Sequence, residues 1–194
     1  YNYKEKYLFE FNSRYDGSSR FIRDRRWNLF NSTSVGWNMA LEDFWGVDQI
    51  QMLKLRASYG ELGNQNTDSW YPFYLSQPFS VNAGGWLLNG IRPNIASAPG
   101  IVSEFMTWER VKSYNVGLDL AVLENRLVIN FDYFTRHTLD MVGPAEEQPV
   151  ILGTAVPRVN NADLKAYGFE LELNWRDQIG EFDYDIRGSV SDDQ

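Results

Sequence analysis

The stretch from Tyr167 to Arg176 reads YGFELELNWR, in which large apolar and polar side chains alternate strictly. Successive side chains of a β-strand point to opposite faces, so this pattern predicts a strand with one apolar and one charged face. The same alternation recurs along the chain. We expect strands over the residues 3–16, 26–39, 52–60, 111–121, 126–137, 165–176 and 182–191.

These predicted strands have the length that a membrane crossing requires. A tilted transmembrane strand needs roughly 9 to 11 residues, whereas a typical soluble strand has about 5 to 6. Aromatic residues also gather at both ends of the apolar face, as in the girdles of outer-membrane barrels. If successive strands run up and down, one rim holds Tyr15, Trp27, Tyr59, Tyr114, Tyr133 and Tyr167, and the other holds Tyr7, Trp37, Trp175 and Tyr184. The predicted fold class is therefore all-β, an antiparallel transmembrane β-barrel segment.

The connections between the predicted strands are of two kinds. Residues 123–125 and 177–180 form tight turns, whereas residues 61–110 and 138–164 are long and rich in Gly, Pro, Asn and aromatics. Outer-membrane barrels have short periplasmic turns and long extracellular loops, so we expect the two long loops to be extracellular. Residues 1–194 are predicted to form one partial barrel domain, since about seven strands do not close a usable pore. No signal peptide precedes the first strand, and we expect an internal fragment of a longer chain.

Composition excludes several classes of function. The 194 residues contain no cysteine and carry a formal net charge of -8, which excludes disulfide scaffolds and cysteine-based zinc sites and argues against a nucleic-acid partner. The single histidine, His137, has no second histidine or cysteine to complete a metal site. We therefore expect no metal and no cofactor.

Charged side chains on the polar face are candidates for the inner surface of the barrel. They could line a substrate path or contact a plug, or they could simply pair across neighbouring strands, which is the interpretation we favour. The lumen-facing candidates are Arg14, Arg56, Asp119, Asp132, Arg136, Glu170 and Glu172.

Aromatic residues in the first long loop are the strongest hint of binding. They could stack on sugar rings or anchor a protein partner, although packing within the loop itself is the simplest interpretation. The ligand- or partner-contact candidates are Trp70, Tyr71, Phe73, Tyr74, Phe79 and Trp86.

Neighbouring carboxylates might suggest glycoside chemistry, as in Glu170 with Glu172 and Asp183 with Asp185. These pairs fall within the alternating pattern, where a solvated charged face explains them. We expect no catalytic residues and no enzymatic activity.

A series of short motifs recurs in order along nearly the whole chain. The motifs are Tyr7–Glu10, Arg14–Phe21, Val35–Trp37, Leu53–Gly60, Gly63–Gln65, Trp108–Glu109, Asn115–Asp119, Asn125–Leu127, Asp132–Tyr133, Gly153, Val159–Ala162 and Gly168–Leu171. Taken together, this series resembles the SusC/RagA family of TonB-dependent outer-membrane transporters. The chain differs from the family pattern at Phe30–Ser32, where a proline is expected, and in an insertion over residues 76–99.

The resemblance implies a 22-stranded barrel in the outer membrane, with a plug domain that is not in this chain. It also implies energised import of an oligosaccharide or a peptide, a SusD-like surface lipoprotein as partner, and contact with the TonB complex through parts absent here. The outward face would meet outer-membrane lipid. The alternatives are a soluble all-β carbohydrate-binding module and an adhesive barrel that does not transport.

Overall fold

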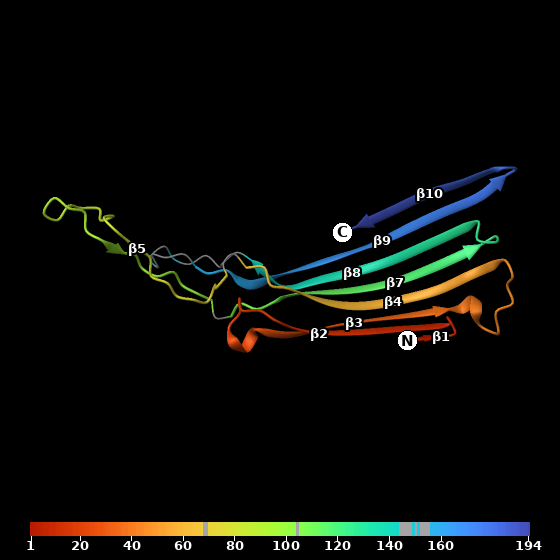
Figure 1. Ribbon diagram of the computed structural model, residues 1–194, viewed down its shortest axis with the longest axis horizontal. Coiled ribbons are helices and arrows are strands. Elements are labelled where there is room, and N and C mark those ends of the chain that lie inside the picture. The colour runs from red at the N-terminus through yellow and green to blue at the C-terminus, as the bar shows by residue number, and fades with distance from the viewer. Residues whose placement is uncertain (68–69, 104, 144–148, 150, 152–155) are drawn as a thin grey trace.

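The computed structural model describes residues 1–67, 70–103, 105–143, 149, 151 and 156–194. Eight strands form one antiparallel sheet in the order β1-β2-β3-β4-β7-β8-β9-β10, and Figure 1 shows them lying side by side. The predicted all-β antiparallel fold is confirmed. The strands are β1 (Asn2–Tyr3), β2 (Tyr7–Gly17), β3 (Trp27–Asn38), β4 (Ile50–Asn64), β7 (Glu109–Val122), β8 (Leu127–Gly143), β9 (Val159–Ile179) and β10 (Phe182–Asp193).

The remaining elements are short. Among the described residues, the 3-10 helices η1 (Arg23–Arg25) and η2 (Met39–Leu41) lie at opposite ends of β3. Strands β5 (Phe79–Ser80) and β6 (Ile95–Ala96) pair only with each other. They belong to residues 70–103, called the arm below, which extend far beyond one end of the sheet (Figure 1). Among the described residues, the structure contains no helix with the length and apolarity needed to cross a membrane.

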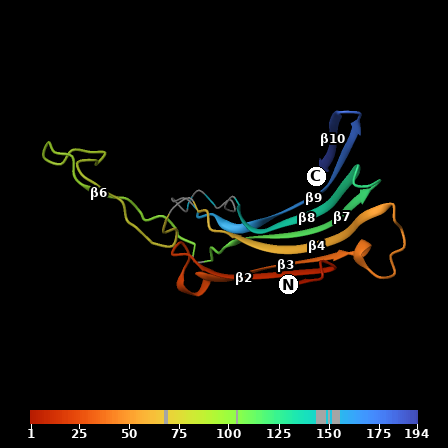
Figure 2. The ribbon, with the colours of Figure 1, turned by 45° about the vertical axis from the view of Figure 1, so that its right-hand side comes forward.

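The sheet is a curved, open wall rather than a closed barrel, as Figure 2 shows. Residues directly opposite each other in antiparallel strands share a face. One cross-strand row on the apolar face joins five strands through consecutive pairs, and consists of Leu55, Leu118, Phe131, Leu171 and Val190. The register therefore combines the alternation within each strand into one continuous apolar face.

The two ends of the sheet differ, and we name them by their connections. At the turn end, β7 and β8 are joined through Leu123, Glu124 and Asn125, which all adopt positive φ, and β9 and β10 through a turn with Gly180 at φ +63°. At the loop end, β4 and β7 are separated by the residues that include the arm, and β8 and β9 by residues 144–158. The two tight turns and the two longest connections thus lie at opposite ends of the sheet. The β2–β3 connection over residues 18–26, at the loop end, and the β3–β4 connection over residues 39–49, at the turn end, are intermediate in length and do not follow this division.

The predicted strand over residues 3–16 is wrong in one respect. A tight turn at Lys4–Lys6 divides it into β1 and β2, because Lys4 and Glu5 adopt φ of 52° and 58° and the Lys6 N–H donates to the carbonyl of Tyr3 at 3.0 Å. Lys4, Glu5 and Lys6 are three consecutive charged residues that interrupt the alternation, and this interruption was the available sign of the turn.

At the loop end the strands are longer than predicted. Strand β4 continues to Asn64, β8 to Gly143, and β9 begins at Val159. Register shifts follow Thr138, and Asp140 adopts φ +56°, which disrupts the side-chain alternation while backbone pairing continues. The long connections therefore run over residues 65–108 and 144–158, and much of the second lies outside the described residues.

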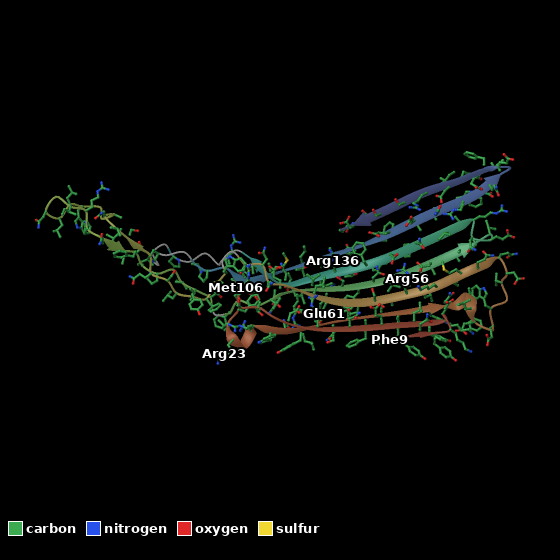
Figure 3. The ribbon with its side chains drawn as sticks, in the orientation of Figure 1. Phe9, Arg23, Arg56, Glu61, Met106 and Arg136 are labelled. Carbon is green, nitrogen blue, oxygen red and sulfur yellow. The ribbon has the colours of Figure 1, made fainter. Side chains whose placement is uncertain are left out.

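A small buried core lies at the loop end. Phe21, Phe30, Met106 and Trp108 pack together, and Phe21 is only 1% exposed. The Trp108 ring lies 5.2 Å from that of Phe21 and 5.6 Å from that of Phe30, centroid to centroid. Figure 3 shows Met106 close to η1, where Arg23 is labelled. This core ties the β2–β3 connection to the start of β7.

Candidate functional site

All seven lumen-facing candidates lie on the polar face of the sheet. The register pairs Arg56 with Gly117, Gly117 with Asp132, and Asp132 with Glu170, so this row runs across four strands on the face opposite to the apolar row. Figure 3 labels Arg56 on β4 and Arg136 on β8, while Phe9 of the apolar face projects beyond β2. The polar face is thus a single surface shared by all the long strands.

Arg56 forms the centre of this face by binding two carboxylates on two other strands. Its Nε and Nη2 donate to the Asp119 carboxylate at 2.9 and 2.8 Å, and Nη2 also donates to Asp132 Oδ2 at 3.0 Å. The bidentate contact with Asp119 fixes the plane of the guanidinium. Three strands are therefore joined by one side chain, as the cross-strand pairing interpretation predicts for Arg56, Asp119 and Asp132.

Gly117 explains how Arg56 reaches across β7. Gly117 lies between Arg56 and Asp132 in the cross-strand row, and a Cβ at this position would stand 2.6 Å from Asp132 Oδ1 and 2.8 Å from Arg56 Cζ. The missing side chain leaves the space through which the guanidinium passes. Glycine at position 117 therefore makes room for the contacts of Arg56, and its backbone does not adopt the positive φ that would by itself favour glycine.

The other lumen-facing candidates lie apart from this cluster. Glu172 pairs with Arg187 of β10 at 3.3 Å, and Arg14 pairs with Asp16 at 2.7 Å. Arg136 and Glu170 line a shallow hollow on the wall that also includes residues 113–115, 134 and 135. The described residues hold no group of three or more His, Asp, Glu or Cys side chains arranged to bind a metal ion.

A larger groove lies near Arg14, where β3 and β4 separate. Their pairing stops at Ser32 and Gly60, and beyond that point β4 pairs only with β7. The groove has a volume of about 480 Å³ and is lined by residues of β2, β3, β4 and β7. Phe30, one of the lining residues, packs its ring against Gly63 of β4, where an added Cβ would overlap the ring.

The loop aromatics predicted as contact residues are not brought together. Tyr71, Phe73 and Tyr74 form a group at the base of the arm, with ring centroids 5.6 Å and 4.9 Å from that of Tyr74. Trp70 is 71% exposed and lies beneath the guanidinium of Arg20, 4.3 Å from its ring centroid. They do not form the loop's buried core, which is built instead from the Phe21 and Trp108 cluster.

Phe79 and Trp86 lie further out, on the arm itself. Phe79 is in β5, and Trp86 is 73% exposed near the tip. The tip turns through Asn89 and Gly90, whose φ values of 51° and 78° are those of the Asn-Gly hairpin turn. Exposed apolar side chains flank this turn in the sequence, namely Trp86, Leu87, Leu88 and Ile91.

A hydrogen-bonded network at the turn end was not predicted. Trp37 Nε1 donates to Glu42 at 2.9 Å, and the Lys6 ammonium lies 3.3 Å from Glu42 and 3.0 Å from Asp43. Hydrogen bonds from the Tyr7 hydroxyl and Trp37, together with Lys6, lower the pKa of Glu42. The Asp43 carboxylate in turn raises the pKa of Lys6. This network holds the β3–β4 connection against the aromatic rim.

Side chains that organise the loop end were also missed. Asn160 donates to the carbonyls of Thr107 and Asp140 at 3.1 and 2.5 Å and accepts from the Thr107 N–H at 2.9 Å. Glu109 accepts from the Val142 N–H at 2.9 Å and from Asn64 Nδ2 at 2.6 Å. Both residues occur in the family motifs noted above, which was the available signal.

A polar, ion-paired face backed by an apolar face with aromatic rims defines this chain as part of the wall of a membrane β-barrel. A family model described as TonB dependent receptor-like, β-barrel matches residues 1–194. The chain belongs to this family, whose members are receptors and transporters of the Gram-negative outer membrane. Membership excludes the soluble binding module considered above.

Individual relatives agree with this assignment. TonB-dependent receptor P3 of Formosa agariphila is 32% identical over 177 residues, and TonB-dependent receptor SusC of Bacteroides thetaiotaomicron is 30% identical over 199 residues. The alignments cover 91% and 98% of this chain but only 17% and 19% of those relatives. The chain thus spans about a fifth of their length.

The fold has solved counterparts as well. The RagAB peptide importer matches in its open-open state with a TM-score of 0.79 and in its closed-closed state with 0.78. Both matches have 21% sequence identity and cover 97% of this chain and 20% of that chain. At this identity the likeness concerns the fold.

Proposed function

We propose that this chain is part of the barrel of a TonB-dependent importer that carries a nutrient of the oligosaccharide or peptide class across the outer membrane. The polar face forms the lumen, where Arg56, Asp119 and Asp132 stiffen the wall while Arg136 and Glu170 stay available to a plug or a passing solute. The observation that carries this proposal is the ion-paired polar face on a membrane-barrel wall of this family.

We further propose that the long connections are extracellular and that the arm contacts a SusD-like surface lipoprotein. Trp86, Leu87 and Leu88 expose apolar area at the tip, and side chains of this kind anchor protein interfaces. Contact with the TonB complex would be made by parts of the protein outside this chain. Direct stacking on a sugar is the second use of the arm, since Trp86 has the ring for it.

Removing the outer part of the arm, residues 77–98, tests the partner contact. The Ser97 N–H donates to the carbonyl of Pro78 at 2.9 Å, so a short Gly-Ser link can replace Gln77–Ala98 in the full-length parent. We expect the variant to assemble as a heat-modifiable barrel in the outer membrane but to retain less lipoprotein on purification in detergent. Full retention of the lipoprotein would contradict the contact, and loss of assembly would make the arm structural.

A point variant separates the tip from the base. Replacing Trp86 and Leu88 with Ser should reduce lipoprotein retention, whereas replacing Tyr71 and Tyr74 with Ser is the matched control at the base. Import and adhesion are distinguished by uptake of fluorescent peptides and oligosaccharides into whole cells with and without a proton uncoupler. Uptake that the uncoupler abolishes supports the importer, and surface binding without uptake supports the adhesive barrel.

A further inference from the structure

A row of basic side chains lies on the apolar face, just beyond its aromatic rim at the loop end. Lys112 of β7 pairs directly with His137 of β8, and His137 pairs with Lys165 of β9. These three residues, called the basic row below, share the face of Tyr114 and Tyr167, which stand two residues nearer the middle of their strands. Positions on this face carry apolar side chains elsewhere in the same strands. Three basic residues at these positions therefore require an explanation.

Two of the three side chains rest against the aromatic rim. The Lys165 ammonium lies 5.8 Å from the centroid of the Tyr167 ring, and the His137 ring lies 6.4 Å from that of Tyr114. Within the described part of the chain, no carboxylate lies within ion-pair distance of Lys165. The ammonium of Lys165 is therefore exposed, and its contact in the described structure is the ring of Tyr167.

Lys112 is partly compensated. Its ammonium lies 4.0 Å from Glu61 Oε1, the limit of an ion pair, and the same oxygen accepts a hydrogen bond from the Tyr59 hydroxyl at 2.5 Å. Asp163, two residues from Lys165 along β9, accepts a hydrogen bond from the Asp140 N–H and is not in ion-pair contact with the row. Among the described residues, Glu61 is therefore the carboxylate that pairs with the row, and the two lysines carry more positive charge than it offsets. Lys165 carries most of that excess.

The depth of the row matches the layer of lipid head groups. The interval from Trp175 to Lys165 on β9 has the roughly 9 to 11 residues with which a tilted strand crosses the hydrocarbon. Strands about 4.8 Å apart and tilted by about 40° offset neighbouring residues by about 3 Å in depth, so the row is spread over about 6 Å. A head-group layer is about 5 to 7 Å thick on each side of the bilayer.

We propose that the basic row binds the phosphate groups of a phosphorylated glycolipid in the outer leaflet, with Lys112 and Lys165 as the two cationic contacts. The lysines stand two strand spacings apart, about 10 Å, which suits a head group with two phosphates better than one with a single phosphate. The Tyr114 and Tyr167 rings below them then pack against the sugar and the upper acyl chains. The proposal rests on the extracellular placement of the long loops and is independent of what is transported.

The test uses the full-length parent protein in phosphatidylcholine nanodiscs that contain bis-phosphorylated lipid A or its monophosphorylated form. Native mass spectrometry after transfer to detergent measures how much of each lipid stays bound. We expect the wild type to retain the bis-phosphorylated form preferentially. Replacing Lys112 and Lys165 with Gln should lower that retention by about 30-fold, since each lysine near a charged membrane surface contributes about one kcal/mol.

Four further variants separate the contributions of the two lysines and control for position. Lys4→Gln is the control at the turn end, where the Lys4 ammonium lies 5.5 Å from the Tyr3 ring in a contact like that of Lys165, and it should leave retention unchanged. Lys165→Gln alone should have a larger effect than Lys112→Gln, because Glu61 already offsets Lys112. Replacing both lysines with Arg should restore retention and shows that the positions tolerate substitution.

Equal retention by the wild type and the double Gln variant, with both assembled, would overturn the proposal. Loss of retention in Lys4→Gln instead of Lys165→Gln would overturn it too, and would place the other end of the sheet at the outer surface. Peptide and oligosaccharide uptake, measured separately on the same variants, should be unaffected, so failure here is distinct from failure of the proposed transport.

Discussion

The curved sheet and the arm are both rich in apolar and aromatic side chains, but only the sheet arranges them on one surface. In the sheet, Leu55, Leu118, Phe131, Leu171 and Val190 form one row because direct cross-strand pairs hold the register. In the arm, pairing is limited to the two residues of β5 and β6 and an isolated bridge between Leu88 and Ile91. Apolar side chains thus build a membrane wall only where long pairing fixes their face.

This difference decides what each region can do. The sheet can separate lipid from a polar lumen, since its two faces remain distinct over seven long strands. The arm keeps no inner and outer face, and its exposed tip is suited to contact with another molecule in water. Substitutions should therefore act on assembly in the sheet and on binding in the arm.

The largest effect is expected from breaking the apolar face. Leu171→Arg places a charge in the row between Phe131 and Val190, which costs about 2 to 4 kcal/mol at mid-membrane, so little folded barrel should form. Glu172→Gln on the same strand removes only an exposed pair with Arg187. The measurement is heat-modifiable migration of the outer-membrane fraction. Equal tolerance of both substitutions would show that the face assignment is wrong.

A smaller effect is expected from filling the space at Gly117. Gly117→Val should displace Arg56 from Asp132 and lower the free energy of unfolding of the detergent-purified parent by about 1 to 3 kcal/mol, as overpacking does. Gly60→Val is the matched control on the same face, since its Cβ would meet only Ser32, at 3.8 Å. Urea unfolding followed by tryptophan fluorescence measures both. Equal destabilisation would show that Gly117 is not a passage for Arg56.

The smallest effect is expected in the β3–β4 connection, which side-chain hydrogen bonds hold against the sheet, unlike the arm. Hydrogen bonds from Tyr7 and Trp37 and the charge of Lys6 lower the pKa of Glu42, so its contribution is present above its unfolded pKa and is lost as the pH falls through its folded pKa. Acidification should therefore loosen the connection around η2, and Glu42→Gln should loosen it at neutral pH. Limited proteolysis at residues 39–49 measures this, with Asp48→Asn, at an exposed position of the same connection and outside the network, as the control. Unchanged protection in Glu42→Gln at all pH values would contradict the role of Glu42.

The two-faced sheet could be predicted from sequence alone because the alternation that produces it is a local pattern within each strand. Alternation such as Phe169, Leu171 and Leu173 against Glu170 and Glu172 requires no knowledge of distant residues. The long strands were therefore placed correctly over most of their length. Their loop ends were underestimated, since backbone pairing beyond the membrane needs no alternating pattern.

The features that were missed depend on residues far apart in the chain. The core joins Phe21 to Trp108. Pairing of Arg56 across neighbouring strands was expected, but its reach from β4 to Asp132 of β8 past the missing side chain of Gly117 was not. Neither arrangement has a periodic signal. The six loop aromatics were predicted as one candidate group, but the arm is extended and separates Trp86 from Trp70.

The central claim is that the two faces of the sheet meet lipid and water respectively. The chain contains no cysteine, so single cysteines can be placed at positions 168–175 of β9 in a cysteine-free full-length parent and labelled with a fluorophore in outer-membrane vesicles. Quenching by a lipid-soluble and by a water-soluble agent should alternate, with 169, 171 and 173 quenched from lipid and 170, 172 and 174 from water. Uniform quenching along the strand, or the reverse alternation, would contradict the account.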